Sequence, residues 1–171
     1  GVEKDPYLIS SLEDFIYLRE SVYYNESFWR HWFTQTDDID FSRVKYWRAI
    51  SDETSGYSFG ANYNGSGYKL LNFKQDETQN PINRTIFGNA YGNIFNVHIV
   101  DCEFTGSSNG IISYLISQGG KIFNNVVELS DSENAASMAL VYNNSGNISN
   151  NLILLPNATT DFKISITSGA Y

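Results

Sequence analysis

The chain has 171 residues, of which 42% are hydrophobic, and a formal net charge of −8. This length suits one domain, and the hydrophobic content suffices for a packed core. The excess of acidic residues repels nucleic acid and anionic membranes and disfavours a strongly acidic polysaccharide as partner. The single cysteine excludes a disulfide within the chain. No apolar run approaches the roughly 20 residues that a membrane span requires, so we expect no membrane insertion. The negative net charge leads us to expect no nucleic-acid partner.

Residues 12–24 are predicted to form a helix that ends near Asn25. Ser11 supplies a polar cap, and Asp14 places an acid in the first turn, where the helix dipole favours negative charge. Three apolar side chains follow at helical spacing on one side: Phe15, Leu18 and Val22. We expect this apolar stripe to lie over the open end of the first coil of the repeat described below and to act as a cap.

The next segment concentrates aromatic side chains that could stack on sugar rings. These candidate ligand-binding residues are Trp29, Trp32, Tyr46 and Trp47. Exposed aromatic side chains mark a binding site when they cluster inside a polar rim. The cap and the first coil also need bulky side chains to close the core, so packing is the competing interpretation.

Asp37, Asp38 and Asp40 form the densest group of carboxylates. Paired carboxylates can catalyse glycoside hydrolysis or hold calcium. In an extended strand, however, Asp38 and Asp40 share a face and Asp37 opposes them. A polysaccharide lyase would also need a nearby cation, and the sequence offers Arg43, Lys45 and Arg48. Nothing in the sequence places these cations opposite the acids, so we assign no catalytic residue.

A repeat runs through the rest of the chain. Asparagine recurs shortly after a glycine at steps of 24, 28 and 26 residues: Asn72, Asn96, Asn124 and Asn150. A period of this size indicates stacked structural units rather than one closed globule. Short runs of Ile, Val, Leu and Phe around each asparagine are typical of strands. Each step leaves room for about three short strands, which is one coil of a parallel β-helix.

This geometry predicts which side chains stack between coils. One inward ladder should hold Ile94, Ile122 and Ile148, and a second should hold Ile99, Val127 and Ile153. A third strand of each coil should come from residues 85–92, 110–120 and 138–146. The corner asparagines should adopt left-handed backbone angles and hydrogen-bond the backbone of the adjacent coil through their amides. Asn125 and Asn151 offer an alternative alignment one residue later.

Isolated histidines and the absence of nucleotide-binding motifs argue against a cofactor. His31 and His98 have no second histidine or cysteine at the spacing of a zinc or iron site. His98 should face outward from a strand, and Cys102 should be a small buried side chain. We therefore expect no metal and no cofactor.

Four segments resemble the surface proteins of bacteria and archaea that carry GLUG-type repeats on a pectin-lyase-like right-handed β-helix. In that family a helix with an LEDL-like start precedes a DIDLS-like strand, a glycine-rich strand and GLFG-like repeats. The corresponding segments here are Leu12–Phe15, Asp38–Ser42, Asn64–Tyr68 and Ile86–Gly88. The resemblance covers residues 7–153, and it departs from the family at Tyr63, where the family has aspartate. It implies an adhesin-like surface protein and a structural role for Asp40.

The sequence thus predicts an all-β protein, a right-handed parallel β-helix with an N-terminal capping helix. Residues 1–171 should form one domain, with the cap and first strand in 7–30 and the coils in 31–160. We expect a fragment of a longer prokaryotic protein, secreted or on the cell surface, with further coils or self-association at its C-terminal end. The expected function is non-enzymatic binding of a host carbohydrate or protein. A carbohydrate-active enzyme on the same fold and a passive spacer are the alternatives.

Overall fold

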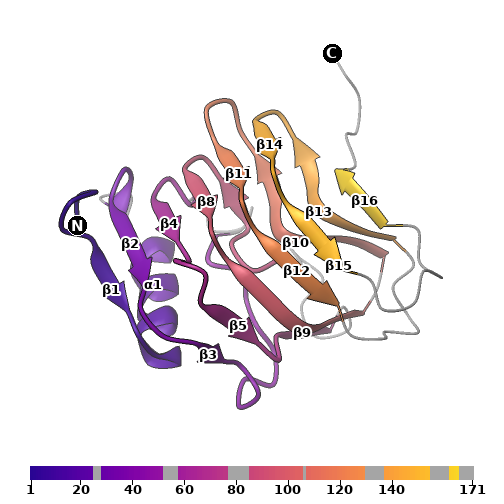
Figure 1. Cartoon of the computed structure of the whole chain (residues 1–171), viewed down its shortest axis with the longest axis horizontal. Coiled ribbons are helices and arrows are strands. Elements are labelled where there is room, and N and C mark those ends of the chain that lie inside the picture. The colour runs from indigo at the N-terminus through magenta and orange to yellow at the C-terminus, as the bar shows by residue number, and fades with distance from the viewer. Residues whose placement is uncertain are drawn as a thin grey trace.

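The computed structural model describes residues 1–24, 28–51, 58–76, 85–105, 107–129, 137–154 and 162–165. Parallel strands from successive coils stack into three sheets, and the chain advances from the N-terminal to the C-terminal end as it winds (Figure 1). The structure confirms the predicted all-β class, the parallel β-helix and the N-terminal capping helix. The predicted helix end near Asn25 and residues 155–160 at the expected end of the coils lie outside the described residues.

Three parallel sheets form the sides of the solenoid. Sheet 1 contains β1 (Tyr7–Ile9), β2 (Trp32–Gln35), β4 (Asn62–Asn64), β8 (Asn93–Phe95), β11 (Lys121–Phe123) and β14 (Asn147–Ser149). Sheet 2 contains β3 (Ile39–Asp40), β5 (Lys69–Leu71), β9 (His98–Thr105), β12 (Val126–Leu129) and β15 (Leu152–Leu154), and β6 (Lys74–Asp76) pairs with the end of β9. Sheet 3 contains β7 (Asn89–Ala90), β10 (Ser107–Ile116), β13 (Ser137–Asn144) and β16 (Phe162–Ser165).

The inward ladders match the prediction from the repeat. In sheet 1, Ile122 pairs in register with Ile94 on one side and Ile148 on the other. In sheet 2, Val127 is in register with Ile99 and Ile153. Side chains alternate between the two faces of a strand, so a slip of one residue would move a whole apolar ladder into water. Burial of these ladders therefore fixes the register of the coils.

The corner asparagines also adopt the predicted backbone conformation. Asn72, Asn96, Asn124 and Asn150 have φ angles between 54° and 57°, in the left-handed region that asparagine tolerates better than most residues. The amide of Asn72 donates to Asp40 Oδ1 at 2.9 Å, and that of Asn96 donates to Asn64 Oδ1 at 3.0 Å. The amides of Asn72 and Asn96 thus contact side chains of the preceding coil, whereas the sequence predicted contacts with its backbone.

A buried amide ladder runs one residue further along the chain. Asn125 Nδ2 donates to Asn151 Oδ1 at 2.9 Å and to the carbonyl of Ile94 at 3.2 Å, and Asn125 Oδ1 accepts from the backbone N–H of Val97 at 2.9 Å. Asn151 Nδ2 in turn donates to the carbonyl of Ile122 at 3.0 Å. The alternative alignment on Asn125 and Asn151 therefore supplies a second set of links between the coils, in which Asn125 is buried.

Helix α1 (Leu12–Tyr24) starts as the sequence predicts. Ser11 Oγ accepts from the backbone N–H of Asp14 at 3.1 Å, and the Asp14 carboxylate accepts from the backbone N–H and the hydroxyl of Ser10, both at 2.9 Å. These hydrogen bonds satisfy free N–H groups at the start of the helix. The backbone N–H of Ser10, followed by the Ser11 side chain, lowers the pKa of Asp14.

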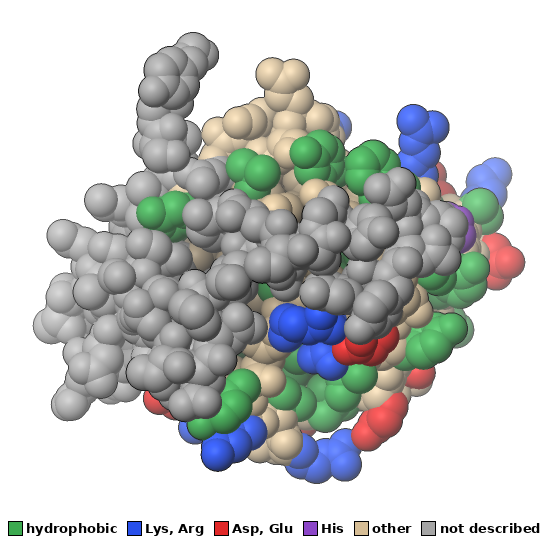
Figure 2. Space-filling model, turned by 180° about the vertical axis from the view of Figure 1, so that it is seen from behind, with side chains coloured by type: hydrophobic (Ala, Val, Ile, Leu, Met, Phe, Trp, Pro, Cys, Tyr) green, Lys and Arg blue, Asp and Glu red, His purple; other side chains and the backbone are tan. Residues whose placement is uncertain are grey.

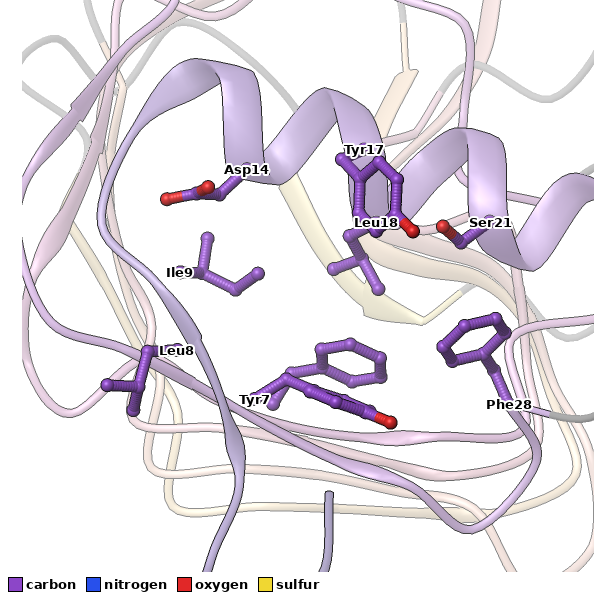
Figure 3. A pocket seen from close by; sticks show the side chains of 9 residues that line it. Tyr7, Leu8, Ile9, Asp14, Tyr17, Leu18, Ser21 and Phe28 are labelled. Atoms are coloured by element: carbon purple, nitrogen blue, oxygen red, sulfur yellow. The ribbon is translucent and has the colours of Figure 1, made fainter.

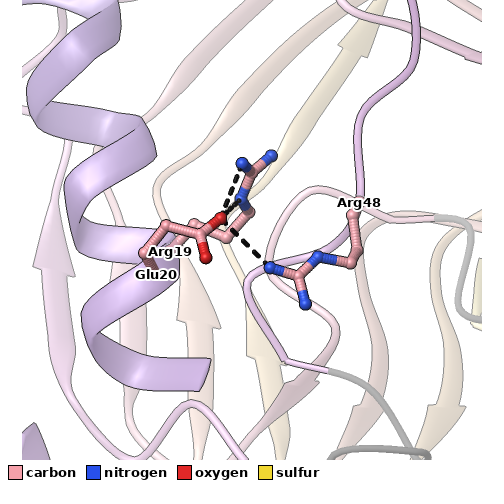
Figure 4. A network of polar contacts seen from close by, with 3 residues as sticks. All are labelled: Arg19, Glu20 and Arg48. Carbon is pink, nitrogen blue, oxygen red and sulfur yellow. Dashed lines mark hydrogen bonds and ion pairs between the residues drawn. The ribbon is translucent and has the colours of Figure 1, made fainter. Parts of the chain in front are cut away.

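The apolar side of α1 closes the N-terminal end of the core, where the helix lies behind β2 and β4 (Figure 1). Phe15 is fully buried and its ring packs against four other buried rings: Phe41, Trp47, Tyr63 and Phe87. Glu20 binds Arg19 at 2.8 Å and Arg48 at 3.1 Å, which joins the helix to the segment after β3 (Figure 4). The helix is thus part of the hydrophobic core and is also held by ion pairs.

Candidate functional site

The structure separates the four aromatic residues that the sequence grouped as ligand-binding candidates. Trp47 is only 1% exposed, and its indole N–H donates to the carbonyl of Ile86 at 3.1 Å. The Arg19 guanidinium lies 4.6 Å from the centre of its ring. Trp47 is therefore a core residue that a ligand cannot reach in this structure, and the competing packing interpretation holds for it.

Tyr46 is exposed but does not belong to the same surface as Trp29 and Trp32. The Lys45 ammonium lies over its ring, 5.1 Å from the ring centre. The segment that contains it is held by Arg48 to α1 and by the backbone N–H of Ile50 to residue Ile86. Tyr46 therefore lies beside the cap rather than on sheet 1.

Trp29 forms an exposed aromatic pair with Tyr91, which is not among the candidates predicted from the sequence. Their rings are stacked with centroids 5.7 Å apart and an interplanar angle of 22°, and they are 46% and 43% exposed. The Trp29 ring rests on Gly60, where an added Cβ would lie 2.7 Å from a ring atom. Both aromatic residues precede strands of sheet 1, so the pair lies along one margin of that sheet.

Trp32 lies on the outward face of sheet 1, which we call the sheet-1 face. Trp32 and Phe95 meet edge to face with centroids 6.2 Å apart, and Phe95 stacks on Phe123 at 4.8 Å. Asn93 Nδ2 donates to Asn62 Oδ1 at 2.8 Å. The face consists of the outward side chains Leu8, Trp32, Thr34, Asn62, Asn64, Asn93, Phe95, Lys121, Phe123, Asn147 and Ser149.

Charge is distributed unevenly between the faces of the solenoid. None of the outward side chains of the sheet-1 face is acidic, although the chain carries a net charge of −8, and Lys121 is its charged residue. Acids lie instead before β1, on α1, at the corner after β2 and on sheet 2, where Asp40 and Glu128 point outward. Seen from behind, acidic and basic side chains lie interspersed (Figure 2). The sheet-1 face is thus an aromatic and amide surface on an acidic protein.

The acidic cluster serves the corner between β2 and β3. Asp37 Oδ1 accepts from the backbone N–H of Asp38 at 2.8 Å, and Asp38 Oδ1 accepts from that of Lys69 at 2.8 Å. Asp40 accepts from the backbone N–H and hydroxyl of Ser42 and from the Asn72 amide. Arg43 binds Glu13 at 3.0 Å. The carboxylates therefore stabilise local backbone, and the nearest cation in sequence is paired with another acid.

We predict that Asp40 makes the protein sensitive to acid. The Asn72 amide, followed by the backbone N–H of Ser42, lowers the pKa of Asp40. A carboxylate whose pKa is lower in the folded state than in the unfolded state stabilises the fold at pH values above its unfolded-state pKa of about 4. This contribution is lost as the pH falls below that value and the folded carboxylate becomes protonated. Between pH 7 and pH 3, urea unfolding should show a smaller loss of stability for Asp40→Asn than for the wild type. Equal pH dependence in both proteins would contradict the role given to Asp40.

His98 and Cys102 have structural surroundings. His98 Nε2 lies 2.7 Å from Glu128 Oε1 on the outer side of sheet 2, as expected for an outward histidine. Cys102 is buried, and the burial raises the pKa of its thiol. Among the described residues, no three histidine, cysteine, aspartate or glutamate side chains come together as a metal-binding group.

Two hollows lined by described residues lie near the candidate surfaces. One, of about 240 Å³, lies between β1 and α1 at the N-terminal end and is mostly apolar, with Tyr7 and Tyr17 at its rim (Figure 3). Its carboxylate, that of Asp14, is engaged at the start of α1. The other, of about 420 Å³, follows the corner between sheets 1 and 2 past Asn96 and Asn124. The corner hollow borders the sheet-1 face and extends it with further amides.

Within the described residues, the structure contains no helix with the length and apolarity needed to cross a membrane. The fold places the chain among parallel β-helix proteins. No protein-family model matches the chain, and no curated protein matches it.

Comparison with solved structures finds a Bacteroides ovatus protein that carries the provisional name immunoglobulin A1 protease, with a TM-score of 0.59 and 18% identity. The match covers 86% of this chain and 49% of that protein, so the chain spans about half of its length. At this identity the likeness shows a shared fold alone.

Proposed function

We propose that this chain is a non-enzymatic, adhesin-like β-helix module that binds a host glycan through the sheet-1 face. The observation that carries the proposal is the acid-free surface of aromatic rings and amides, bordered by the exposed Trp29–Tyr91 pair. Aromatic rings present apolar faces on which sugar rings stack, and amides can both donate to and accept from hydroxyl groups.

The scaffold favours such binding because it holds the contact groups in place before the ligand arrives. The inner strands of sheet 1 pair with a parallel neighbour on both sides, and the end strands β1 and β14 pair on one side. Each strand also places an inward side chain in or against the core. Binding sites built on rigid strands lose little conformational entropy when a ligand binds. A rigid, shallow surface of this kind suits an extended glycan chain.

A carbohydrate-active enzyme on the same fold is the alternative, and it has less support. Such an enzyme would need carboxylates placed across a groove from a cation. Asp38 and Asp40 instead bind corner backbone, and Arg43 binds Glu13. The likeness to the Bacteroides ovatus protein lends no support to an enzyme, because a shared fold does not determine function.

The resemblance to GLUG-repeat surface proteins supports the extracellular location in this proposal. The motifs that carry it, at Leu12–Phe15, Asp38–Ser42 and Asn64–Tyr68, fall on α1, the first corner and the turn after β4. We propose a prokaryotic module that is secreted or attached to the cell surface. Further coils of the same protein, a host protein or self-association at the C-terminal end would be compatible partners.

Affinity electrophoresis against a panel of soluble polysaccharides and host glycoproteins tests the proposal, with mass spectrometry of each polysaccharide after overnight incubation. We expect the protein to be retarded without new products, and we expect Trp29→Ala and Trp32→Ala each to weaken the affinity about tenfold. Tyr46→Ala, which removes an exposed ring outside the face, is the matched control and should behave as the wild type. Shortened or unsaturated products would support the enzyme, and an absence of retardation would support a passive spacer.

A further inference from the structure

We infer that the glycan bound by the sheet-1 face carries an isolated anionic group and that Lys121 binds this group. The inference rests on the proposed function and adds the chemical class of the ligand. It follows from the position of Lys121, from the state of the other cations in the chain and from the distribution of acids around the face.

Lys121 lies within the row of amides on the sheet-1 face. It is exposed at the start of β11, where it pairs in register with Asn93 on β8 and Asn147 on β14. Neighbouring strands lie about 4.8 Å apart. An anion held by the ammonium group therefore lies beside the Asn147 amide on one side and the Asn93 amide on the other, which donates one N–H to Asn62 Oδ1 and has a second N–H to offer. An ammonium with nearby neutral donors is a suitable site for a carboxylate or sulfate oxygen.

Most of the other described cations are already engaged. Among the described residues, four basic side chains form ion pairs with glutamates: Arg19, Arg43, Arg48 and Lys74. Lys45 lies over the Tyr46 ring. None of the ion pairs between described residues involves Lys121, and no outward residue of its sheet is acidic. The Lys121 charge is therefore available to a ligand.

The surrounding acids favour one anionic group over a polyanion. Asp37 and Asp38 follow β2, which lies three strands from β11 and therefore about 14 Å away. Screening limits interactions between exposed charges to about 8 Å at physiological ionic strength. An anion at Lys121 thus escapes these acids. A polyanion that crosses the face would extend toward them and toward Glu128 on sheet 2, where repulsion would oppose binding.

Binding of matched glycans to the full chain tests the inference. The probes are one immobilised oligosaccharide in neutral, sialylated and sulfated forms, measured by biolayer interferometry in 0.15 M salt. We expect the wild type to prefer an acidic form over the neutral one, and Lys121→Met to weaken binding of that form about fivefold while leaving the neutral form unchanged. Lys121→Arg should retain the preference. Lys4→Met removes an exposed charge outside the face and should have no effect.

The outcomes separate the inference from the proposed function. A loss of preference in Lys121→Met, with an unchanged thermal midpoint, supports the inference, and the two acidic arms show whether carboxylate or sulfate is bound. An unchanged preference in Lys121→Met, with weakened binding of every form in Trp32→Ala, would overturn the inference and leave the proposed function standing. If none of the forms binds and the polysaccharide panel is also negative, the proposed function fails as well.

Discussion

Asn125→Ala should destabilise the protein by about 3 kcal/mol, the effect of leaving buried backbone groups without partners. The Asn125 side chain is buried and bonds three neighbours in adjacent coils: the Val97 N–H, the Ile94 carbonyl and the Asn151 amide. An alanine side chain can form none of these hydrogen bonds, so the three buried groups lose the partner that Asn125 provides. The free energy of unfolding measured by urea denaturation checks this expectation.

Asn147→Ala is the matched control for Asn125→Ala. Asn147 belongs to the same repeat but is exposed on β14, so its removal should change stability by no more than about 0.5 kcal/mol. Asn125→Asp keeps an acceptor for the Val97 N–H but turns a buried carboxylate toward two acceptors, the Ile94 carbonyl and Asn151 Oδ1, so at neutral pH it should be at least as destabilising as the alanine variant. A loss below about 1 kcal/mol in Asn125→Ala would show that the buried amide ladder contributes little.

Phe15→Ala should destabilise the protein by about 4 kcal/mol, within the range for removing a buried phenylalanine ring. Phe15 is fully buried, and its ring meets Phe41 and Tyr63 edge to face with centroids 5.3 and 5.7 Å away. The rings it touches come from several segments of the chain, so they cannot collapse together into the vacated space. The same urea measurement gives the change in the free energy of unfolding.

Two variants of α1 distinguish loss of packing from loss of helix. Phe15→Leu retains most of the volume and should cost less than about 1.5 kcal/mol. Tyr17→Ala removes an exposed ring on the same helix and should change stability by about 0.5 kcal/mol or less. If Phe15→Ala were as stable as Tyr17→Ala, α1 would not be the cap that closes the core.

The repeat made the coils predictable because one rule acts at every step. A parallel, in-register stack requires the same kind of side chain at the same height in each coil, so the spacing of Asn96 and Asn124 also gave the inward ladders around Ile94 and Ile122. The exact partners of the amides were less predictable. The sequence offers adjacent asparagines at 124–125 and 150–151, and only the position of the core decides which of each pair turns inward.

The candidate site was only partly predictable. Trp47 lies in a segment without a repeat, and its burial depends on α1 and Phe73, which are distant in sequence. Tyr91 and Phe95 were missed because their accessibility emerges only once strands of different coils lie side by side. One signal was present for the rings of the face: Phe95 and Phe123 directly follow inward isoleucines, and alternation along a strand turns them outward.

The most direct test of the sheet-1 face is a titration of ¹⁵N-labelled protein with a glycan that binds, observed through the indole N–H signals of its three tryptophans. Trp29 and Trp32 belong to the face and its margin, whereas the Trp47 indole is bonded to the Ile86 carbonyl inside the core. We predict that the Trp29 and Trp32 signals shift with increasing glycan and that the Trp47 signal stays in place. A shift confined to Trp47, or saturating binding without any change at Trp29 and Trp32, would place the site elsewhere on the molecule.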